Sequence, residues 1–325
     1  MRKEINQDIS IWKKGNKSAL IAAIVNTIIS FVKGIAYYFT GNVAMMAETL
    51  HSLGDAANQF FVFIGSALSK KAPTEKYPNG FGRLVNLVLL VAVVIVGIMS
   101  YENVVQGIEH IRNPVPTKGI GISITVLGIG FLLEFYVLCK AALEIVHESN
   151  SKEKGLKIIT QIFTNLKKAK PATKLVFMED LVATSGGLIA IIGILLSYYL
   201  GWHQAEGVAS ILIGLMMFYV VARVFLDNAR GVLGETDDEL EEFISEKVIK
   251  HSEIQDIDTL YAMKEGEEFH IEMKLEIRPD LTIQEANQIK LEIERKIFEL
   301  NGVSNVIIEF LVDDGHRKYI SKSTE

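Results

Sequence analysis

Long apolar runs fill much of the first 230 positions of this chain and constrain its fold more than any other feature. A helix needs roughly 20 apolar residues to cross a bilayer. The six runs that satisfy or approach this length lie at 18–40, 43–68, 84–107, 118–141, 172–199 and 204–226. The chain is 49% hydrophobic and 22% charged, which is compatible with this pattern because charged residues concentrate outside the runs. The pattern predicts a membrane protein with an all-α six-helix transmembrane bundle at 18–234.

Basic residues mark one side of this predicted bundle. They lie before the first run and in the connections that follow the second and fourth runs, whereas the other connections carry few. The positive-inside rule therefore predicts that both termini are cytoplasmic and that 1–17 is a cytoplasmic N-terminal segment. The first run carries no cleavage signal and is expected to remain as an anchor. The polar segment 149–170 has apolar residues at helical spacing, which predicts a cytoplasmic amphipathic helix.

Two of the apolar runs contain ionisable residues at membrane depth. His51 and Asp55 are four residues apart and share one helical face, roughly 14–20 Å below the end of their run. Glu179 and Asp180 lie roughly 12–14 Å from the opposite end of theirs. Such residues cost about 2.5–3.5 kcal/mol each on insertion scales and therefore indicate function. One imidazole and several carboxylates would suit a divalent cation such as Zn²⁺; a hydrogen-bonded contact between helices without metal is the alternative.

Other polar residues within the runs have weaker interpretations. Glu48 shares the face of His51, where it can be a ligand, an acid on the access path or an interfacial residue; the last two interpretations are favoured. Asn26, Ser30 and Lys33 are expected to line an aqueous cavity; a bond from Asn26 to a neighbouring helix is the alternative. Glu134 is expected close to the cytoplasmic end of its helix, where Lys140 is a candidate partner.

The segment 235–313 has the pattern of a small soluble domain. Its order is helix, strand, strand, helix, strand, which predicts a cytoplasmic ferredoxin-like α+β (αββαβ) domain. Thr282 and Glu285 predict a capping box at the second helix. The tail 314–325 follows. A regulatory metal site in this domain would draw on His270, Glu272, Glu309 and Asp313, although alternating acids on a solvated strand explain these residues equally well.

Composition excludes several classes of function. A net charge of −6 argues against a nucleic-acid partner. The single cysteine, Cys139, excludes an intramolecular disulfide and a thiolate metal cluster. An enzyme is the least favoured class, because the sequence has no nucleophile motif, phosphate loop or zinc-hydrolase motif.

The complete pattern resembles the cation diffusion facilitator (cation efflux) family over nearly the whole chain. The resemblance is carried by His51-xxx-Asp55 after a short turn, the Tyr77-Pro78-Asn79-Gly80-Phe81-Gly82-Arg83 stretch, the Leu233-Gly234-Glu235 exit and the αββαβ tail. It implies a homodimer that exchanges a cytoplasmic divalent cation for protons by alternating access. It also implies a transport site at His51, Asp55, Glu179 and Asp180.

The chain departs from the usual family pattern at three places. The fifth run carries adjacent Glu179 and Asp180 instead of two ligands four residues apart, which resembles a subgroup of the family. Tyr77 and Phe81 stand where two histidines usually bind a peripheral metal, so that site is expected to be absent. The positions that bind a metal pair in some soluble domains hold Asn287, Glu309 and Leu311. The soluble domain is therefore expected to support dimerisation without a strong zinc pair.

The interpretation favoured by these observations is a Zn²⁺/H⁺ antiporter of the plasma (inner) membrane, with Co²⁺, Fe²⁺ and Mn²⁺ as further candidate substrates. A membrane-bound metal sensor and a transporter of a non-metal cation are the alternatives.

Overall fold

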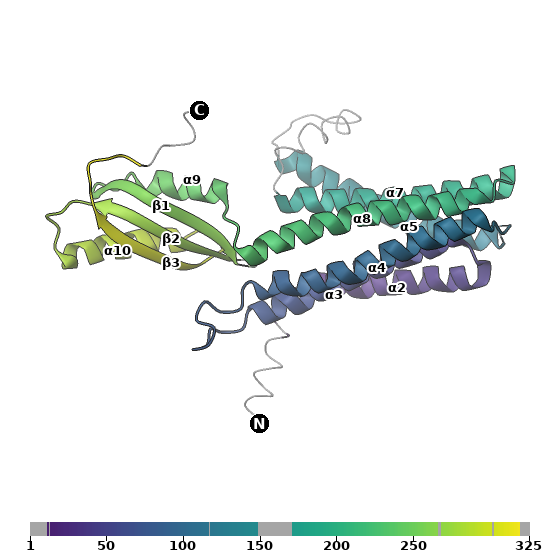
Figure 1. The fold of residues 1–325 in the computed structure, drawn as a ribbon, viewed down its shortest axis with the longest axis horizontal. Helices are drawn as coiled ribbons and strands as arrows, with labels where there is room; N and C mark the ends of the chain where they lie inside the picture. Colours follow the sequence, from purple (N-terminus) through teal and green to yellow (C-terminus); the bar gives the residue numbers. More distant parts are fainter. Residues whose placement is uncertain are drawn as a thin grey trace, which may run out of the picture. The chain divides into compact units, whose positions relative to one another are not determined.

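Long helices form the first part of the fold, and a three-stranded sheet with two shorter helices forms the last part (Figure 1). The computed structural model describes residues 12, 14–116, 118–148, 171–265, 268–300 and 302–318. The predicted amphipathic segment 149–170, most of the N-terminal segment 1–17 and the end of the tail 314–325 lie outside the described residues.

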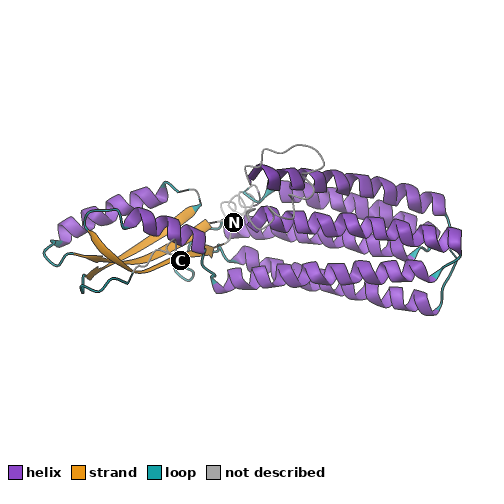
Figure 2. Ribbon diagram, turned by 90° about the horizontal axis from the view of Figure 1, so that it is seen from above, coloured by secondary structure: helices purple, strands orange, loops and turns teal. Residues whose placement is uncertain are grey.

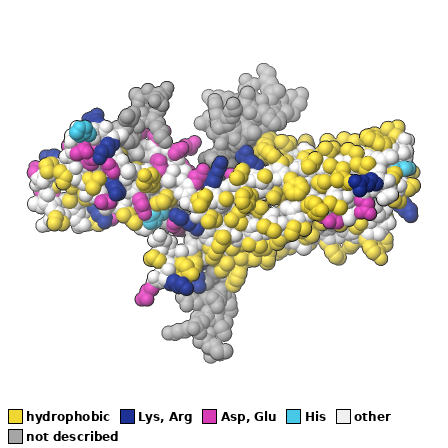
Figure 3. Space-filling view, in the orientation of Figure 1, with side chains coloured by type: hydrophobic (Ala, Val, Ile, Leu, Met, Phe, Trp, Pro, Cys, Tyr) yellow, Lys and Arg dark blue, Asp and Glu magenta, His cyan; other side chains and the backbone are white. Residues whose placement is uncertain are grey.

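All six predicted long helices are present. They are α2 (Lys17–Thr40), α3 (Val43–Ser69), α4 (Leu84–Arg112), α5 (Ile120–Glu148), α7 (Pro171–Leu200) and α8 (Gln204–Leu233). Within the described parts of the chain, α2, α4, α5, α7 and α8 are long and apolar enough to cross a membrane. Hydrophobic side chains cover much of their visible surface (Figure 3). α3 has 27 residues but is not among these five helices. It is the helix that carries Glu48, His51 and Asp55. That α3 crosses the membrane therefore stays a prediction.

Tight turns join two of the helix pairs. Gly41 has φ +64° between α2 and α3, a left-handed conformation that glycine adopts without steric cost. The Oδ1 atom of Asn42 then accepts a hydrogen bond from the backbone N–H of Met45 at 2.9 Å, which satisfies a donor in the first turn of α3. Gly201, with φ +66°, has the same conformation between α7 and α8. These turns explain how only two or three residues can connect antiparallel helices.

Glycines allow α4 and α8 to approach each other at backbone distance. A Cβ atom built on Gly107 would lie 2.6 Å from the carbonyl oxygen of Gly207, and one built on Gly207 would lie 2.6 Å from the carbonyl oxygen of Gly107. Small residues at helix crossings are a common packing device in membranes, where the hydrophobic effect does not drive helices together.

The soluble domain has the predicted αββαβ order. Its elements are α9 (Asp238–Val248), β1 (Ile254–Glu265), β2 (Glu268–Ile277), α10 (Ile283–Phe298) and β3 (Val303–Val312). The sheet order is β1-β2-β3, with β1 antiparallel and β3 parallel to β2. α9 packs against β1 and α10 against β3, and Figure 2 shows these helices beside the orange strands. The predicted capping box is also confirmed, because Thr282 and Glu285 exchange hydrogen bonds at the start of α10.

The chain forms two compact units. Lys17–Phe61 and Val91–Phe225 make up one of them, and this unit contains every residue of the predicted metal site. The other unit contains Val62–Leu90 and the chain from Leu226 onward. Within it, the guanidinium Nε of Arg83 forms an ion pair with Glu265 Oε1 at 3.1 Å.

Candidate metal site between α3 and α7

His51 and Asp55 lie one turn apart on α3, as their spacing predicts. His51 Nε2 is 3.6 Å from Asp55 Oδ2, and the two side chains are 9% and 47% exposed. This distance is too long for a hydrogen bond. His51 Nε2 is buried and has no hydrogen-bond partner among the described residues. A buried nitrogen of this kind is costly unless it binds something.

α7 brings the second pair of predicted residues to the same region. Glu179 lies within electrostatic range of Asp55, Asp180 and His51, and Asp180 lies within range of Asp55. The Oδ2 atom of Asp180 is buried, and the described part of the chain offers it no hydrogen-bond partner. The structure therefore brings all four predicted side chains from α3 and α7 into one neighbourhood.

The same region contains a polar side chain that the sequence interpretation did not assign. Thr184 lies one turn after Asp180 on α7, and its Oγ1 is buried without a hydrogen bond to any described residue. Its spacing of four residues from Asp180 was the available signal. A hydroxyl at this point can donate to a carboxylate that holds a metal ion or contact a water molecule on the ion.

The four side chains are near one another, but their potential ligand atoms do not converge on a single point. Within the described residues, three potential ligand atoms that all lie within 4.8 Å of one another occur only at Glu276, Asp313 and Asp314, in the soluble domain. Direct ligation at about 2.0–2.2 Å would require the side chains of the α3–α7 site to move inward. With a neutral imidazole and three ionised carboxylates, the site has a formal charge of −3, which favours a divalent cation.

Three further charged residues lie beside this site: Lys33 and Glu48 are buried, and Glu134 is partly buried. Lys33 Nζ lies 2.9 Å from Glu48 Oε2 and 3.3 Å from Glu134 Oε1, and it also donates to Ser52 Oγ at 2.9 Å. Of the two favoured interpretations of Glu48, the interfacial one is wrong, because this residue is 0% exposed. The predicted pairing of Glu134 with Lys140 is also wrong, because Lys33 of α2 reaches Glu134 instead. Buried carboxylates need a cation, and the long lysine side chain supplies one from a neighbouring helix.

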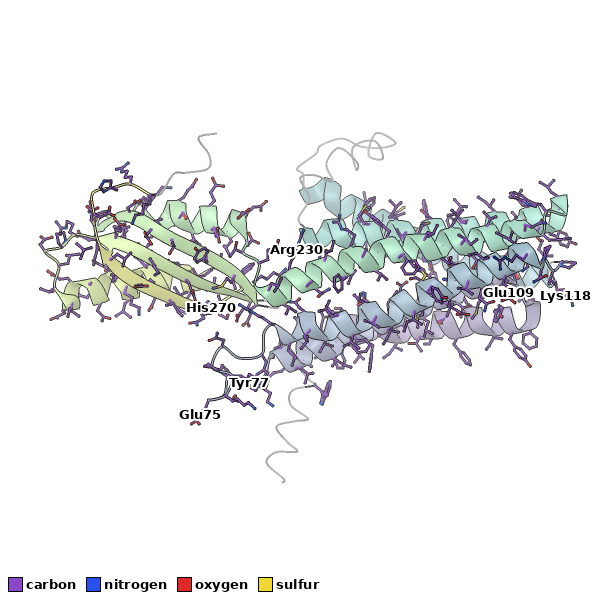
Figure 4. The ribbon with its side chains drawn as sticks, viewed as in Figure 1. Glu75, Tyr77, Glu109, Lys118, Arg230 and His270 are labelled. Carbon is purple, nitrogen blue, oxygen red and sulfur yellow. The ribbon has the colours of Figure 1, made fainter. Side chains whose placement is uncertain are left out.

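Of the four residues considered for a regulatory site in the soluble domain, His270 and Glu272 form a pair, but the described residues show no cluster that unites all four. His270, which Figure 4 labels near the sheet, has Nε2 3.2 Å from Glu272 Oε1. Glu309 instead forms an ion pair with Lys274 at 3.2 Å. A lysine neutralises part of the acidic cluster formed by Glu276, Asp313 and Asp314. Lys318 Nζ lies 2.9 Å from Glu276 Oε1 and 3.5 Å from Asp314 Oδ2.

Comparison with known proteins decides the family. A family model described as the cation efflux transmembrane domain matches residues 19–233, and one described as the cation efflux protein cytoplasmic domain matches residues 236–310. The chain belongs to the cation efflux family. The resemblance inferred from its motifs is therefore confirmed, and the chain is an integral membrane protein. The assignment to a Glu-Asp subgroup stays a prediction.

Several named metal-transport proteins are similar to this chain. The human proton-coupled zinc antiporter SLC30A9, mitochondrial, is 25% identical over 232 residues, which cover 70% of this chain and 39% of that protein. The chain thus spans about two fifths of the length of this relative. The cation-efflux pump FieF of Citrobacter koseri is 22% identical over 297 residues, which cover 90% of this chain and 91% of the pump. FieF of Klebsiella pneumoniae is 23% identical over 295 residues, with the same coverage.

Proposed function

We propose that this cation efflux family member exports a divalent metal cation, with Zn²⁺ as the expected substrate, in exchange for protons. The ion binds at His51, Asp55 and the Glu179–Asp180 pair. The observation that carries the proposal is the meeting of an imidazole and three carboxylates from α3 and α7, with buried polar atoms that no described residue satisfies. The human relative is named a proton-coupled zinc antiporter and the bacterial relatives cation-efflux pumps, which supports both parts of the proposal.

Proton exchange follows from the chemistry of these ligands. Carboxylates and imidazole bind a metal ion only when deprotonated, so protons and metal compete for the same atoms. Histidine titrates near neutral pH, which allows a modest pH difference across the membrane to change occupancy. In this mechanism the cytoplasm-facing form binds the metal, and protons displace it after the site has opened to the other side.

The proposal extends to assembly and orientation. The soluble domain, matched by the family's cytoplasmic domain at residues 236–310, supports a homodimer. Both termini lie in the cytoplasm, as the distribution of basic residues predicts.

Metal flux in proteoliposomes tests this function directly. The purified protein is reconstituted, a pH gradient is imposed, and Zn²⁺, Co²⁺, Fe²⁺ and Mn²⁺ are compared as substrates. We expect proton-driven Zn²⁺ flux that His51→Ala or Asp55→Asn abolishes. Glu109→Gln is the matched control, because this exposed acid lies near the end of α4 (Figure 4) and should transport normally.

The same experiment separates the alternatives. Metal binding without flux in the unmodified protein would indicate a membrane-bound sensor. If the protein transports a cation, but no divalent metal is itself transported or competes with that cation, the substrate is a non-metal cation. Normal Zn²⁺ flux in His51→Ala would refute the proposed site.

A further inference from the structure

The network of Lys33, Glu48 and Glu134 has a charge composition that helix packing alone does not require. Its members come from α2, α3 and α5, and the side chains of Lys33 and Glu48 are 2% and 0% exposed, with Glu134 at 20%. One ammonium group contacts two carboxylates, which leaves a formal charge of −1. A packing ion pair would need only one of these acids, and burying the second adds a desolvation cost.

Each carboxylate of this network also has an oxygen that the lysine does not satisfy. Glu48 binds Lys33 through Oε2 and Glu134 binds it through Oε1. Glu48 Oε1 and Glu134 Oε2 are both buried, and neither has a hydrogen-bond partner among the residues described. Leaving buried acceptors without partners is costly, so these two oxygens are acceptors that a cation in place of the lysine could use.

Both free oxygens lie against a pair of glycines on α7. A Cβ atom built on Gly186 would lie 2.8 Å from Glu48 Oε1, and one built on Gly187 would lie 3.4 Å from Glu134 Oε2. The absence of these two side chains leaves the carboxylate oxygens facing backbone. Gly186 and Gly187 are seven residues beyond Glu179 and Asp180, or about 10 Å along α7. On α3, Glu48 lies one turn before His51, so this group adjoins the α3–α7 metal site without including its four residues.

Carboxylate pairs with free oxygens are a donor set that divalent cations accept. We propose that Glu48 and Glu134 form a second cation site, that the Lys33 ammonium occupies it as a tethered cation, and that a divalent metal binds there when this ammonium is absent. Lys33 thereby limits each chain to one bound metal ion. The proposal goes beyond the transport function, because it concerns binding at residues outside the His51 site.

Counting bound metal ions tests the second site. The full-length protein in detergent is dialysed against Zn²⁺, and bound metal is measured per chain by elemental analysis. Lys33→Met, which removes the ammonium and keeps an unbranched side chain, should bind one Zn²⁺ more than the unmodified protein. Adding Glu134→Gln to Lys33→Met should remove this extra ion. Lys140→Met, at an exposed lysine of α5, is the control and should leave the number unchanged.

Two results would overturn the proposal. They are an unchanged Zn²⁺ count in folded Lys33→Met, and an extra ion that persists after Glu134→Gln. If Lys33→Met does not fold without metal, Lys33→Gln is used and thermal unfolding is measured with and without Zn²⁺. Zn²⁺ should raise the Tm of this variant more than that of the unmodified protein, because a ligand stabilises the state that binds it; an equal rise would refute the site.

The second site can be tested independently of the transport site. In a His51→Ala/Asp55→Asn background, Lys33→Met should still gain one Zn²⁺ relative to the same background with Lys33 intact. Loss of that gain would refute the second site. Retention of the gain alongside normal flux in His51→Ala would refute only the proposed transport site.

Discussion

Glu179 and Asp180 are adjacent on α7, so their side chains leave the helix about 100° apart and cannot bind one ion in the same way. Glu179 lies within electrostatic range of both His51 and Asp55. Asp180 lies within such range of Asp55 and of Glu179, and His51 is not among the charges that act on it. This difference favours Glu179 as the direct ligand, with Asp180 acting through water or as a proton acceptor.

We therefore predict that Glu179→Gln weakens Zn²⁺ binding more than Asp180→Asn does. Loss of an outer-sphere partner typically costs about 10–100-fold in metal affinity, so loss of a direct ligand should cost at least about tenfold. Isothermal titration calorimetry of the purified variants measures both dissociation constants. A larger loss in Asp180→Asn would reverse the assignment.

The sequence predicts the four residues of the candidate α3–α7 site but not all of their contacts. His51, Asp55, Glu179 and Asp180 could be found because ionisable groups stand out in apolar runs and their depth follows from helical rise. The pairing of Lys33 with Glu134 could not be found, because it depends on α2 and α5 being neighbours, which local spacing does not encode. The interpretation of Glu48 as interfacial failed for the same reason.

At the scale of helices, the crossing of α4 and α8 depends on two facing glycines. A methyl group at Gly207 would meet the carbonyl oxygen of Gly107 at 2.6 Å and a side-chain carbon of Ile111 at 2.9 Å. Because the first contact is with a backbone atom, the clash can be relieved only if α4 and α8 move apart. The loss of close packing should then exceed the gain in helix propensity that alanine brings.

We predict that Gly207→Ala lowers the thermal stability of the detergent-solubilised protein. Gly128→Ala on α5 is the matched control, because a Cβ atom there would meet nothing within 4 Å. Removing glycine from an open helical position should stabilise the protein by about 0.5–1 kcal/mol. The prediction fails if both variants shift the Tm in the same direction.

The capping box of α10 gives a prediction about pH. The backbone N–H and the hydroxyl of Thr282 each donate to Glu285 Oε2 at 2.8 Å, and these hydrogen bonds lower the pKa of Glu285 below its usual value. A carboxyl group whose pKa is lower in the folded state stabilises that state above its unfolded pKa. This contribution is lost as the pH falls through the folded pKa.

We predict that Glu285→Gln accelerates amide hydrogen exchange in the first turn of α10 at pH 7, relative to the unmodified full-length protein. The difference should disappear as the pH falls through the folded-state pKa of Glu285, which lies below the usual glutamate value, because the unmodified side chain is then protonated. Exchange is followed by mass spectrometry after correction for the intrinsic pH dependence. Glu299→Gln, just beyond the other end of this helix, is the control and should show no such change at the first turn.

Helix and strand positions were predictable because their signals are local. Apolar runs, glycine turns and the capping box fixed most of the element ends within a few residues. α4 and α8 continue to Arg112 and Leu233, beyond the predicted ends at 107 and 226. The apolar pattern stops where the membrane is expected to stop, but backbone hydrogen bonding continues into the polar residues that follow.

For the whole molecule, the arrangement of charge along the chain predicts its orientation. The soluble domain and the connection containing Glu75 and Tyr77 should lie in the cytoplasm, and the connection between Glu109 and Lys118 should lie on the opposite side (Figure 4). The single cysteine makes this testable, because Cys139→Ser removes the only native thiol. New cysteines can then report the side of the membrane on which each position lies.

We predict that, in the Cys139→Ser background, Val115→Cys reacts with a membrane-impermeant maleimide added to intact cells. Ser304→Cys should react only after the cells are permeabilised. Both positions are exposed in the structure, so a difference in labelling reports location and not burial. Ser304 lies on β3 of the soluble domain, and labelling of this position in intact cells would reverse the orientation. The direction of export would reverse with it, because the site would then take its metal from the other side of the membrane.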